Sequence, residues 1–162
     1  MFSPDLIALA ETVLNEARAK NLRIATAESC TGGLISGLLT EIPGSSDVVE
    51  RGFVTYSNKA KRDLLGVPGA MITREGAVSK SVACAMAEGA LARADAELAV
   101  AVTGVAGPSG GTPEKPVGLV HIAAVRSGGT TVHEEHRFGD IGRQEVRLKT
   151  VESALGMLLR LI

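Results

Sequence analysis

The stretch LRIATAESCTGGLISGLL, residues 22–39, decides the fold of this chain of 162 residues. Residues 22–27 are short and mostly apolar, which predicts a buried strand. Apolar side chains then recur at helical spacing, at Leu34, Ile35, Leu38 and Leu39. Residues 28–33 therefore turn a strand directly into a helix, and they bring hydroxyls, a thiol and two glycines to the turn.

The rest of the chain repeats this alternation. Further helices are expected at residues 4–20, 58–65, 79–93 and from about residue 142, and further strands at 48–56, 97–102, 117–125 and 130–138. Ser127-Gly128-Gly129 predicts a hairpin turn, and residues 104–116 form a long loop rich in Gly and Pro. This order predicts an α/β fold, a three-layer α/β/α sandwich around a mixed β-sheet, with residues 1–162 as one domain.

Composition excludes several classes of function. A net charge of -1 without blocks of like charge does not indicate nucleic-acid or anionic-lipid binding, and 2% aromatic residues argue against base stacking. No signal peptide and no apolar run of membrane-spanning length is present, so we expect a cytoplasmic protein without a membrane partner. Cys30 and Cys84 lack metal-ligand spacing and are expected to be reduced thiols.

The turn at residues 28–33 admits three interpretations. Backbone N–H groups at a helix start lack intrahelical partners, so this turn can bind an anion. They can also stabilise an oxyanion if Ser29 projects as a nucleophile. Alternatively Ser29 is an N-cap, and spacing alone favours a cap or a phosphate cradle over a nucleophile. Cys30 is a weaker rival nucleophile, because a free Cys is usually a small buried hydrophobe.

Further chemical groups follow other strands. Lys61 falls in the first turn of the helix expected from residue 58, where the helix dipole favours the neutral amine of a base; a solvated surface lysine is the alternative. Thr103 and Gly104 end a strand where ligands bind in open α/β sheets, unless they form a simple turn. Arg143 can fork onto a phosphate or pair with a surface acid.

The three histidines do not predict a metal site. His133 and His136 lie three apart on an expected strand and so face opposite sides of the sheet, and His121 has no partner in a ligand motif. We therefore predict no metal and no cofactor.

Several motifs together resemble the CinA C-terminal domain family, over nearly the whole chain and in the expected order. They are TAESCTGG at 26–33, PGSS at 43–46, YSN at 56–58, Lys61, GAVS at 76–79, VTGVAGP at 102–108 and GTPEKPVG at 111–118. The family's Gly-Asp-Arg run is altered, because Ile141-Gly142 separates Gly139-Asp140 from Arg143.

The resemblance implies a stand-alone nicotinamide-nucleotide amidase that converts nicotinamide mononucleotide and water into nicotinate mononucleotide and ammonia. It implies that Ser29 is the nucleophile, Lys61 the general base and Tyr56 an aid to proton movement, in a Ser-Lys acyl-enzyme mechanism. It also suggests a homo-oligomer. Substrate binding would fall to Cys30, Thr31, Gly32, Gly33, Ser46, Thr103, Gly104 and, for the phosphate, Arg143.

Two rival functions stay open. One is a nucleotide-binding regulatory module without turnover, which the retention of both Ser29 and Lys61 disfavours. The other is an amidase for a different carboxamide, which the retention of Arg143 disfavours because that residue suits a phosphorylated substrate.

Overall fold

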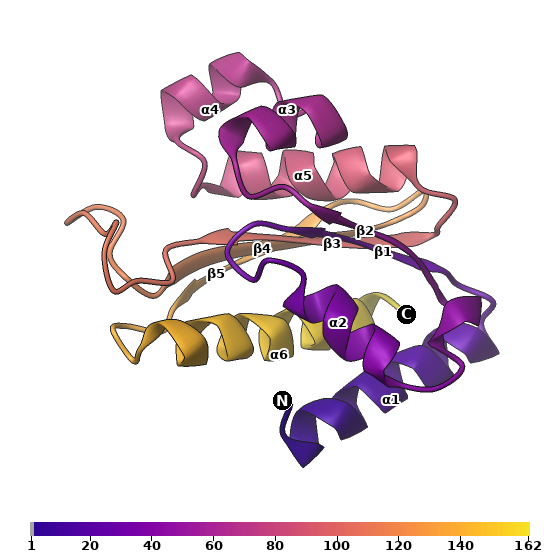
Figure 1. Cartoon of the computed structure of the whole chain (residues 1–162). Coiled ribbons are helices and arrows are strands. Elements are labelled where there is room, and N and C mark those ends of the chain that lie inside the picture. The colour runs from indigo at the N-terminus through magenta and orange to yellow at the C-terminus, as the bar shows by residue number, and fades with distance from the viewer. Residues whose placement is uncertain (1) are drawn as a thin grey trace.

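The computed structural model describes residues 2–162, in which helices and strands alternate from α1 to α6 (Figure 1). In chain order these elements are α1 (Pro4–Ala19), β1 (Ile24–Glu28), α2 (Leu34–Glu41), β2 (Val49–Val54), α3 (Asn58–Leu65), α4 (Gly69–Glu75), α5 (Lys80–Arg93), β3 (Leu98–Gly104), β4 (Leu119–Arg126), β5 (Val132–Arg137) and α6 (Arg143–Leu161). A short 3-10 turn, Ser45–Asp47, precedes β2.

The five strands form one mixed sheet in the order β2-β1-β3-β4-β5. Strand β1 runs parallel to both β2 and β3, whereas β3, β4 and β5 are antiparallel neighbours. Helices α1, α2 and α6 cover one face and α3, α4 and α5 the other (Figure 1). The expected three-layer α/β/α sandwich is confirmed, and the hairpin turn at residues 127–129 joins β4 to β5 as predicted.

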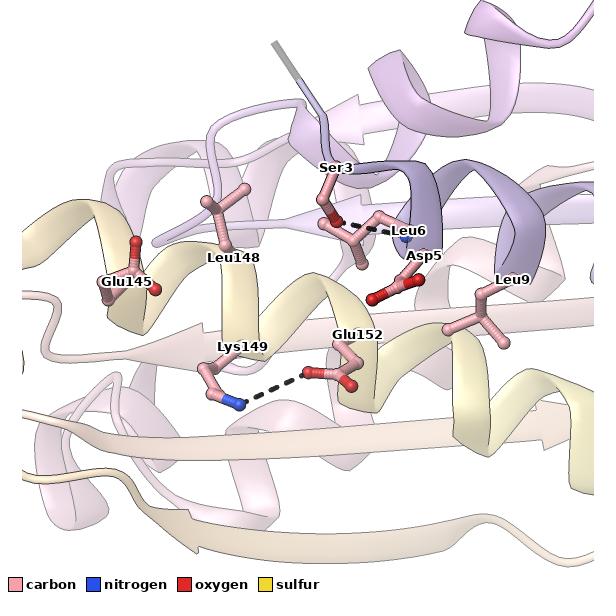
Figure 2. Close-up of a pocket in the computed structure, with 8 residues that line it drawn as sticks. All are labelled: Ser3, Asp5, Leu6, Leu9, Glu145, Leu148, Lys149 and Glu152. Atoms are coloured by element: carbon pink, nitrogen blue, oxygen red, sulfur yellow. Dashed lines mark hydrogen bonds and ion pairs between the residues drawn. The ribbon is translucent and has the colours of Figure 1, made fainter.

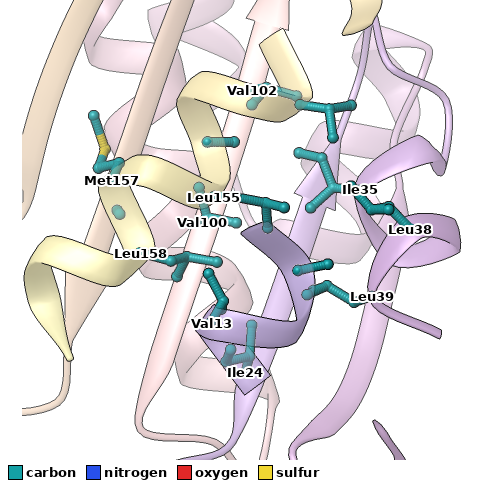
Figure 3. Packing of buried hydrophobic residues seen from close by; sticks show 14 of the residues in the cluster. Val13, Ile24, Ile35, Leu38, Leu39, Val100, Val102, Leu155, Met157 and Leu158 are labelled. Carbon is teal, nitrogen blue, oxygen red and sulfur yellow. The ribbon is translucent and has the colours of Figure 1, made fainter. Parts of the chain in front are cut away.

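The two faces of the sheet are packed differently. Large aliphatic side chains fill the face under α1, α2 and α6, where Ile24, Val100 and Val102 meet Leu38 and Leu155 (Figure 3). On the other face the strands contribute mainly alanines, among them Ala25, Ala27, Ala99, Ala101 and Ala123. Small side chains let α5 lie close to the sheet, as the Ala-rich and Gly-rich sequence of this helix predicts.

Close packing continues from α5 to α3. A Cβ atom added at Gly89 of α5 would collide with the backbone carbonyl of Leu65, the last residue of α3. Only glycine lets the two helices approach this closely. Helix α3 is thereby fixed against the core, together with the lysine that it carries.

Helix α4 is the element that sequence patterning did not predict. Its seven residues lie between Gly66-Val67-Pro68 and Gly76, which read as a continuous loop, and its N-cap Pro68 makes no side-chain capping bond. The remaining boundaries differ from the expected ones by a few residues at most. Within residues 2–162, none of the helices combines the length and the apolar character needed to cross a membrane.

Candidate active site

A pocket of about 210 Å³ opens where the carboxyl ends of β1 and β3 meet the segment after β2. Open α/β sheets bind ligands at this edge. Seven residues that the sequence singled out line it: Ser29, Cys30, Tyr56, Lys61, Thr103, Gly104 and, from the start of α6, Arg143. Asn58, Ala77, Val78 and Ala106 complete the wall and were not assigned a role from the sequence.

The turn after β1 is organised by the buried carboxylate of Glu28. Its Oε1 accepts hydrogen bonds from the Thr31 hydroxyl (2.6 Å) and the Ile35 N–H (2.8 Å). Its Oε2 accepts a hydrogen bond from the Ser36 N–H (3.0 Å). An internal carboxylate therefore takes the free N–H groups at the start of α2, a role that sequence reasoning missed.

This arrangement excludes two of the interpretations of the turn. Ser29 is not the N-cap, because Gly33 holds that position and makes no side-chain capping bond. A phosphate cradle at the helix start is also wrong, because the Glu28 carboxylate already occupies the N–H groups of Ile35 and Ser36. For the same reason these N–H groups are not free to hold an oxyanion.

The Ser29 side chain is instead directed to Lys61. Ser29 and Lys61 are 32 residues apart in the chain, and Lys61 Nζ lies 2.9 Å from Ser29 Oγ. The Lys61 amine also donates to the carbonyl oxygens of Thr55 (2.8 Å) and Tyr56 (3.4 Å). Lys61 does not reach any carboxylate within residues 2–162.

Burial sets the electrostatics of this pair. Lys61 is 1% exposed although it lies in a helix that begins at Asn58 and is otherwise largely solvent-facing. Loss of hydration disfavours the charged amine, so the pKa of Lys61 is lowered from the ordinary lysine value. The alternative of a solvated surface lysine is wrong.

The three contacts of Lys61 fit either protonation state, because an ammonium would donate to all three oxygens; it is the lowered pKa that favours the neutral amine. A neutral amine has two N–H groups and one lone pair, and the two backbone carbonyls accept the two N–H groups. The lone pair is then left for the hydroxyl hydrogen of Ser29, 2.9 Å away. This is the geometry required of a general base beside its nucleophile.

The thiol of Cys30 lies beside this pair and is chemically inert by comparison. Cys30 is buried, and burial raises the pKa of its thiol to about 12. A thiol with that pKa remains protonated at neutral pH and is a poor nucleophile.

Tyr56 and Arg143 meet at the open end of the pocket. The Tyr56 hydroxyl accepts a hydrogen bond from Arg143 Nη2 (3.1 Å), and Arg143 Nη1 donates to the carbonyl of Gly107 (2.8 Å). The Tyr56 hydroxyl makes no hydrogen bond to Ser29 or Lys61 within residues 2–162; only its backbone carbonyl contacts the amine. The altered Gly-Asp-Arg spacing does not remove Arg143 from the pocket.

Thr103 and Gly104 form the floor at the end of β3. The Thr103 hydroxyl donates to the carbonyl of Ala77 (2.9 Å), which ties the wall before α5 to the sheet. A Cβ at Gly104 would lie 2.7 Å from Val120 Cγ2 and 2.8 Å from the Leu119 carbonyl oxygen. Glycine is therefore required where β3 runs against β4.

The other expected substrate-binding residues lie elsewhere. Thr31, Gly32 and Gly33 belong to the turn but do not line the pocket. Ser46 is exposed in the short turn before β2, at the amino end of that strand, whereas the pocket lies at the carboxyl ends. Because a strand separates the two, Ser46 does not reach the reacting groups within one chain.

A larger cavity of about 370 Å³ lies between α1 and α6 and has a different character (Figure 2). Several of its polar groups form contacts within their own helices: the Ser3 hydroxyl accepts a hydrogen bond from the Leu6 N–H, and Lys149 pairs with Glu152 at 3.6 Å. It holds no paired nucleophile and base.

The histidines do not assemble a metal site. His121 Nδ1 and His133 Nε2 lie 2.9 Å apart on the α5 side of the sheet, but no cluster of three metal-ligating side chains is found within residues 2–162. His136 faces the opposite side, where it contacts Glu134.

Comparison with known proteins places the chain in a family. The model of the CinA C-terminal domain matches residues 6–162. A CinA-like protein from Synechococcus sp. is 50% identical over 158 residues, which cover 97% of this chain and 38% of that protein. A putative competence-damage inducible protein from Acetivibrio thermocellus is 51% identical over 88% of this chain and 34% of its own length. The chain thus spans little more than a third of these relatives.

Solved structures match over nearly their whole length. The structure of competence/damage inducible protein CihA from Agrobacterium tumefaciens superposes with a TM-score of 0.98 at 56% identity, covering 99% of this chain and 98% of that one. A CinA superfamily protein from Escherichia coli gives a TM-score of 0.92 at 34% identity, covering 100% and 94%. The family match and these likenesses lead to one conclusion: the chain belongs to the CinA C-terminal domain family.

Proposed function

We propose that this domain is an amidohydrolase that deamidates nicotinamide mononucleotide through an acyl-enzyme on Ser29. The observation that carries the proposal is the 2.9 Å contact between Ser29 Oγ and the buried amine of Lys61, which lacks any carboxylate partner within residues 2–162. A hydroxyl beside a desolvated amine is the arrangement of a Ser-Lys dyad.

Acylation begins with proton transfer. Lys61 accepts the hydroxyl proton of Ser29, and Ser29 Oγ forms a bond to the carboxamide carbon. The tetrahedral intermediate collapses by breaking the C–N bond, and the ammonium of Lys61 returns the proton to the leaving nitrogen, which departs as ammonia. General acid-base catalysis of this kind contributes on the order of 10²- to 10⁴-fold.

Deacylation uses the same base. Lys61 accepts a proton from water, the resulting hydroxide attacks the ester carbon, and the bond to Ser29 Oγ breaks. The proton returns to Ser29, and the carboxylic acid that is formed loses its proton to solvent and leaves as the carboxylate. Each bond is formed and broken without a metal or a cofactor.

Oxyanion donors must come from outside the start of α2, where Glu28 holds the N–H groups of Ile35 and Ser36. The main-chain N–H of Thr31 is not available for this role, because Thr31 is fully buried and does not line the pocket.

Substrate identity rests on the family resemblance, and two features of the pocket support it. The small apolar groups of Ala77, Val78 and Ala106 offer a wall for a flat ring. Arg143 offers a planar guanidinium at the open end, suited to phosphate oxygens. A free carboxamide would make no use of Arg143, which favours a nucleotide over other amides.

The regulatory alternative is suggested by the names of the relatives, which refer to competence and damage rather than to catalysis. Because the chain covers 38% of the Synechococcus relative, activities of the longer proteins are not transferred to it. The buried amine at Ser29 favours turnover over binding alone, since a binding module gains nothing from desolvating a lysine.

Ammonia release from nicotinamide mononucleotide, its riboside and glutamine tests the proposal, with Ser29→Ala and Lys61→Ala beside the native protein. We expect the mononucleotide to be turned over fastest, the riboside more slowly and glutamine not at all, with ammonia release abolished in both variants. Binding of the mononucleotide without ammonia release by the native protein would establish the regulatory module instead. Release from glutamine at a comparable rate would overturn the substrate assignment.

A further inference from the structure

Helix α6 contacts the nucleophile turn through a residue that has no role in the mechanism above. Arg147 follows Arg143 by one helical turn and is half-buried. Its Nε donates to the carbonyl of Cys30 (3.1 Å), and its Nη2 donates to the carbonyl of Thr31 (2.8 Å). Arg147 forms no ion pair within residues 2–162, so these carbonyls are its partners in place of a carboxylate.

The turn is held from two sides. Glu28 accepts the N–H groups of Ile35 and Ser36, which fixes the turn to α2. Arg147 binds the carbonyls of the two residues directly after Ser29, which fixes the same turn to α6. Of these two attachments, the one at Arg147 holds the peptide planes after Ser29, and the Gly32 N–H adds a backbone bond to the Ser29 carbonyl (3.1 Å).

Peptide orientation is what the proposed chemistry depends on. If the peptide between Cys30 and Thr31 rotated by half a turn, the Cys30 carbonyl would leave Arg147, and the turn that carries Ser29 would shift relative to Lys61. Two parallel N–H bonds from one planar guanidinium oppose this rotation, because the fork fits both carbonyls at once. A lysine offers only a point charge on a flexible stem.

We propose that Arg147 is a positioning residue for the nucleophile turn: it holds the peptide planes after Ser29 so that Ser29 Oγ stays against Lys61. This inference rests on the proposed Ser29 chemistry and adds a residue to it. Arg147 does not line the catalytic pocket, so it acts through the turn and not on the substrate.

The test compares Arg147→Met and Arg147→Lys with the native protein. The matched control is Arg160→Met, on the same helix, which removes an exposed arginine paired with Glu134 at the far end. Two rates are measured for each: kcat with nicotinamide mononucleotide, and covalent labelling of Ser29 by a fluorophosphonate. Labelling needs an activated serine but no particular substrate.

We expect Arg147→Met to lower both kcat and the labelling rate on the order of 100-fold, as a small misplacement of a reacting group can. KM should stay within about threefold, because Arg143 is untouched, and Arg147→Lys should recover part of the loss. Arg160→Met should match the native protein. Equal kcat and labelling in the native protein and Arg147→Met, or a loss confined to KM, would overturn the inference.

Chemical rescue keeps the test decisive if Arg147→Met folds poorly. Guanidinium ion at concentrations well below denaturing ones should raise the labelling rate of Arg147→Ala and leave the native protein unchanged. No rescue in a variant that is folded by circular dichroism contradicts a positioning role. If the native protein labels at Ser29 but releases no ammonia from the mononucleotide, the substrate proposal fails while the inference is still tested by labelling.

Discussion

The two ends of the pocket are built in opposite ways. At the inner end Lys61 is 1% exposed and its amine is bonded to Ser29 and two backbone carbonyls. At the outer end Tyr56 is 61% exposed, and within residues 2–162 Arg143 is held by that hydroxyl and one carbonyl. The inner end is complete before a ligand arrives, whereas the outer end keeps donors that a ligand can use. We infer that the inner end carries out the chemistry and that the outer end recognises the substrate.

Breaking the inner end should have the largest effect. Lys61→Met keeps most of the buried volume but removes the base, and we expect kcat for ammonia release to fall on the order of 1,000-fold. Lys59→Met is the control, because Lys59 lies in the same helix, is exposed and pairs with Asp63. Ammonia release by Lys61→Met at a tenth of the native rate or more would contradict the assignment of the base.

Breaking the outer end should affect substrates selectively. Arg143→Met removes a charged donor worth about 1.5–3 kcal/mol, which corresponds to a loss of about 10- to 100-fold in kcat/KM for the phosphorylated substrate. The riboside, without phosphate, should be hydrolysed equally by both proteins. Equal losses of kcat/KM for both substrates would show that Arg143 does not bind the phosphate.

Burial of Lys61 should also make stability depend on pH. In the folded chain the pKa lies below the unfolded value of 10.5, so between the two values the unfolded chain binds more protons and stability rises with pH. The difference in free energy of unfolding, native minus Lys61→Met, should therefore increase toward pH 10.5 by at most about 1.4 kcal/mol per pH unit. Urea denaturation over this range measures it, and a difference that decreases with pH contradicts the burial argument.

The smallest effect is expected at Tyr56. Tyr56→Phe removes one hydrogen bond to Arg143, worth about 0.5–1.5 kcal/mol, so KM for the mononucleotide should rise a few-fold. The pH dependence of kcat should not move, because the hydroxyl does not contact the dyad in residues 2–162. A kcat loss of 100-fold would instead return Tyr56 to the proton transfer suggested by the family resemblance.

Much of the fold could be predicted because its signals are local. The strand at residues 22–27, the helix from Asn58 and the hairpin at residues 127–129 each follow from periodicity or turn residues nearby. Helix α4 lacks these signals, since glycine and proline flank it closely and its capping residue gives no side-chain bond. Its position is fixed by packing against α3 and α5, which no local pattern records.

The candidate site was predictable where a residue type alone suggested chemistry. Ser29, Lys61 and Arg143 could be named in advance and lie in one pocket. Glu28 and Arg147 could not, because a glutamate at the end of a strand and an arginine within a helix are ordinary there. Their roles depend on contacts with residues that lie 7 to 117 positions away in the chain. Glu28 also shows why the phosphate-cradle interpretation is wrong, because its carboxylate takes the N–H groups that would bind a phosphate.

The protonation state of Lys61 can be observed directly, by following the Nζ resonance of ¹⁵N-labelled lysine through a pH titration, with Lys61→Met to assign the signal. If desolvation has made this amine a base, its midpoint falls well below 10.5, the ordinary lysine value. A midpoint at or above that value would mean that residue 61 stays an ammonium ion at neutral pH, unable to accept the proton of Ser29.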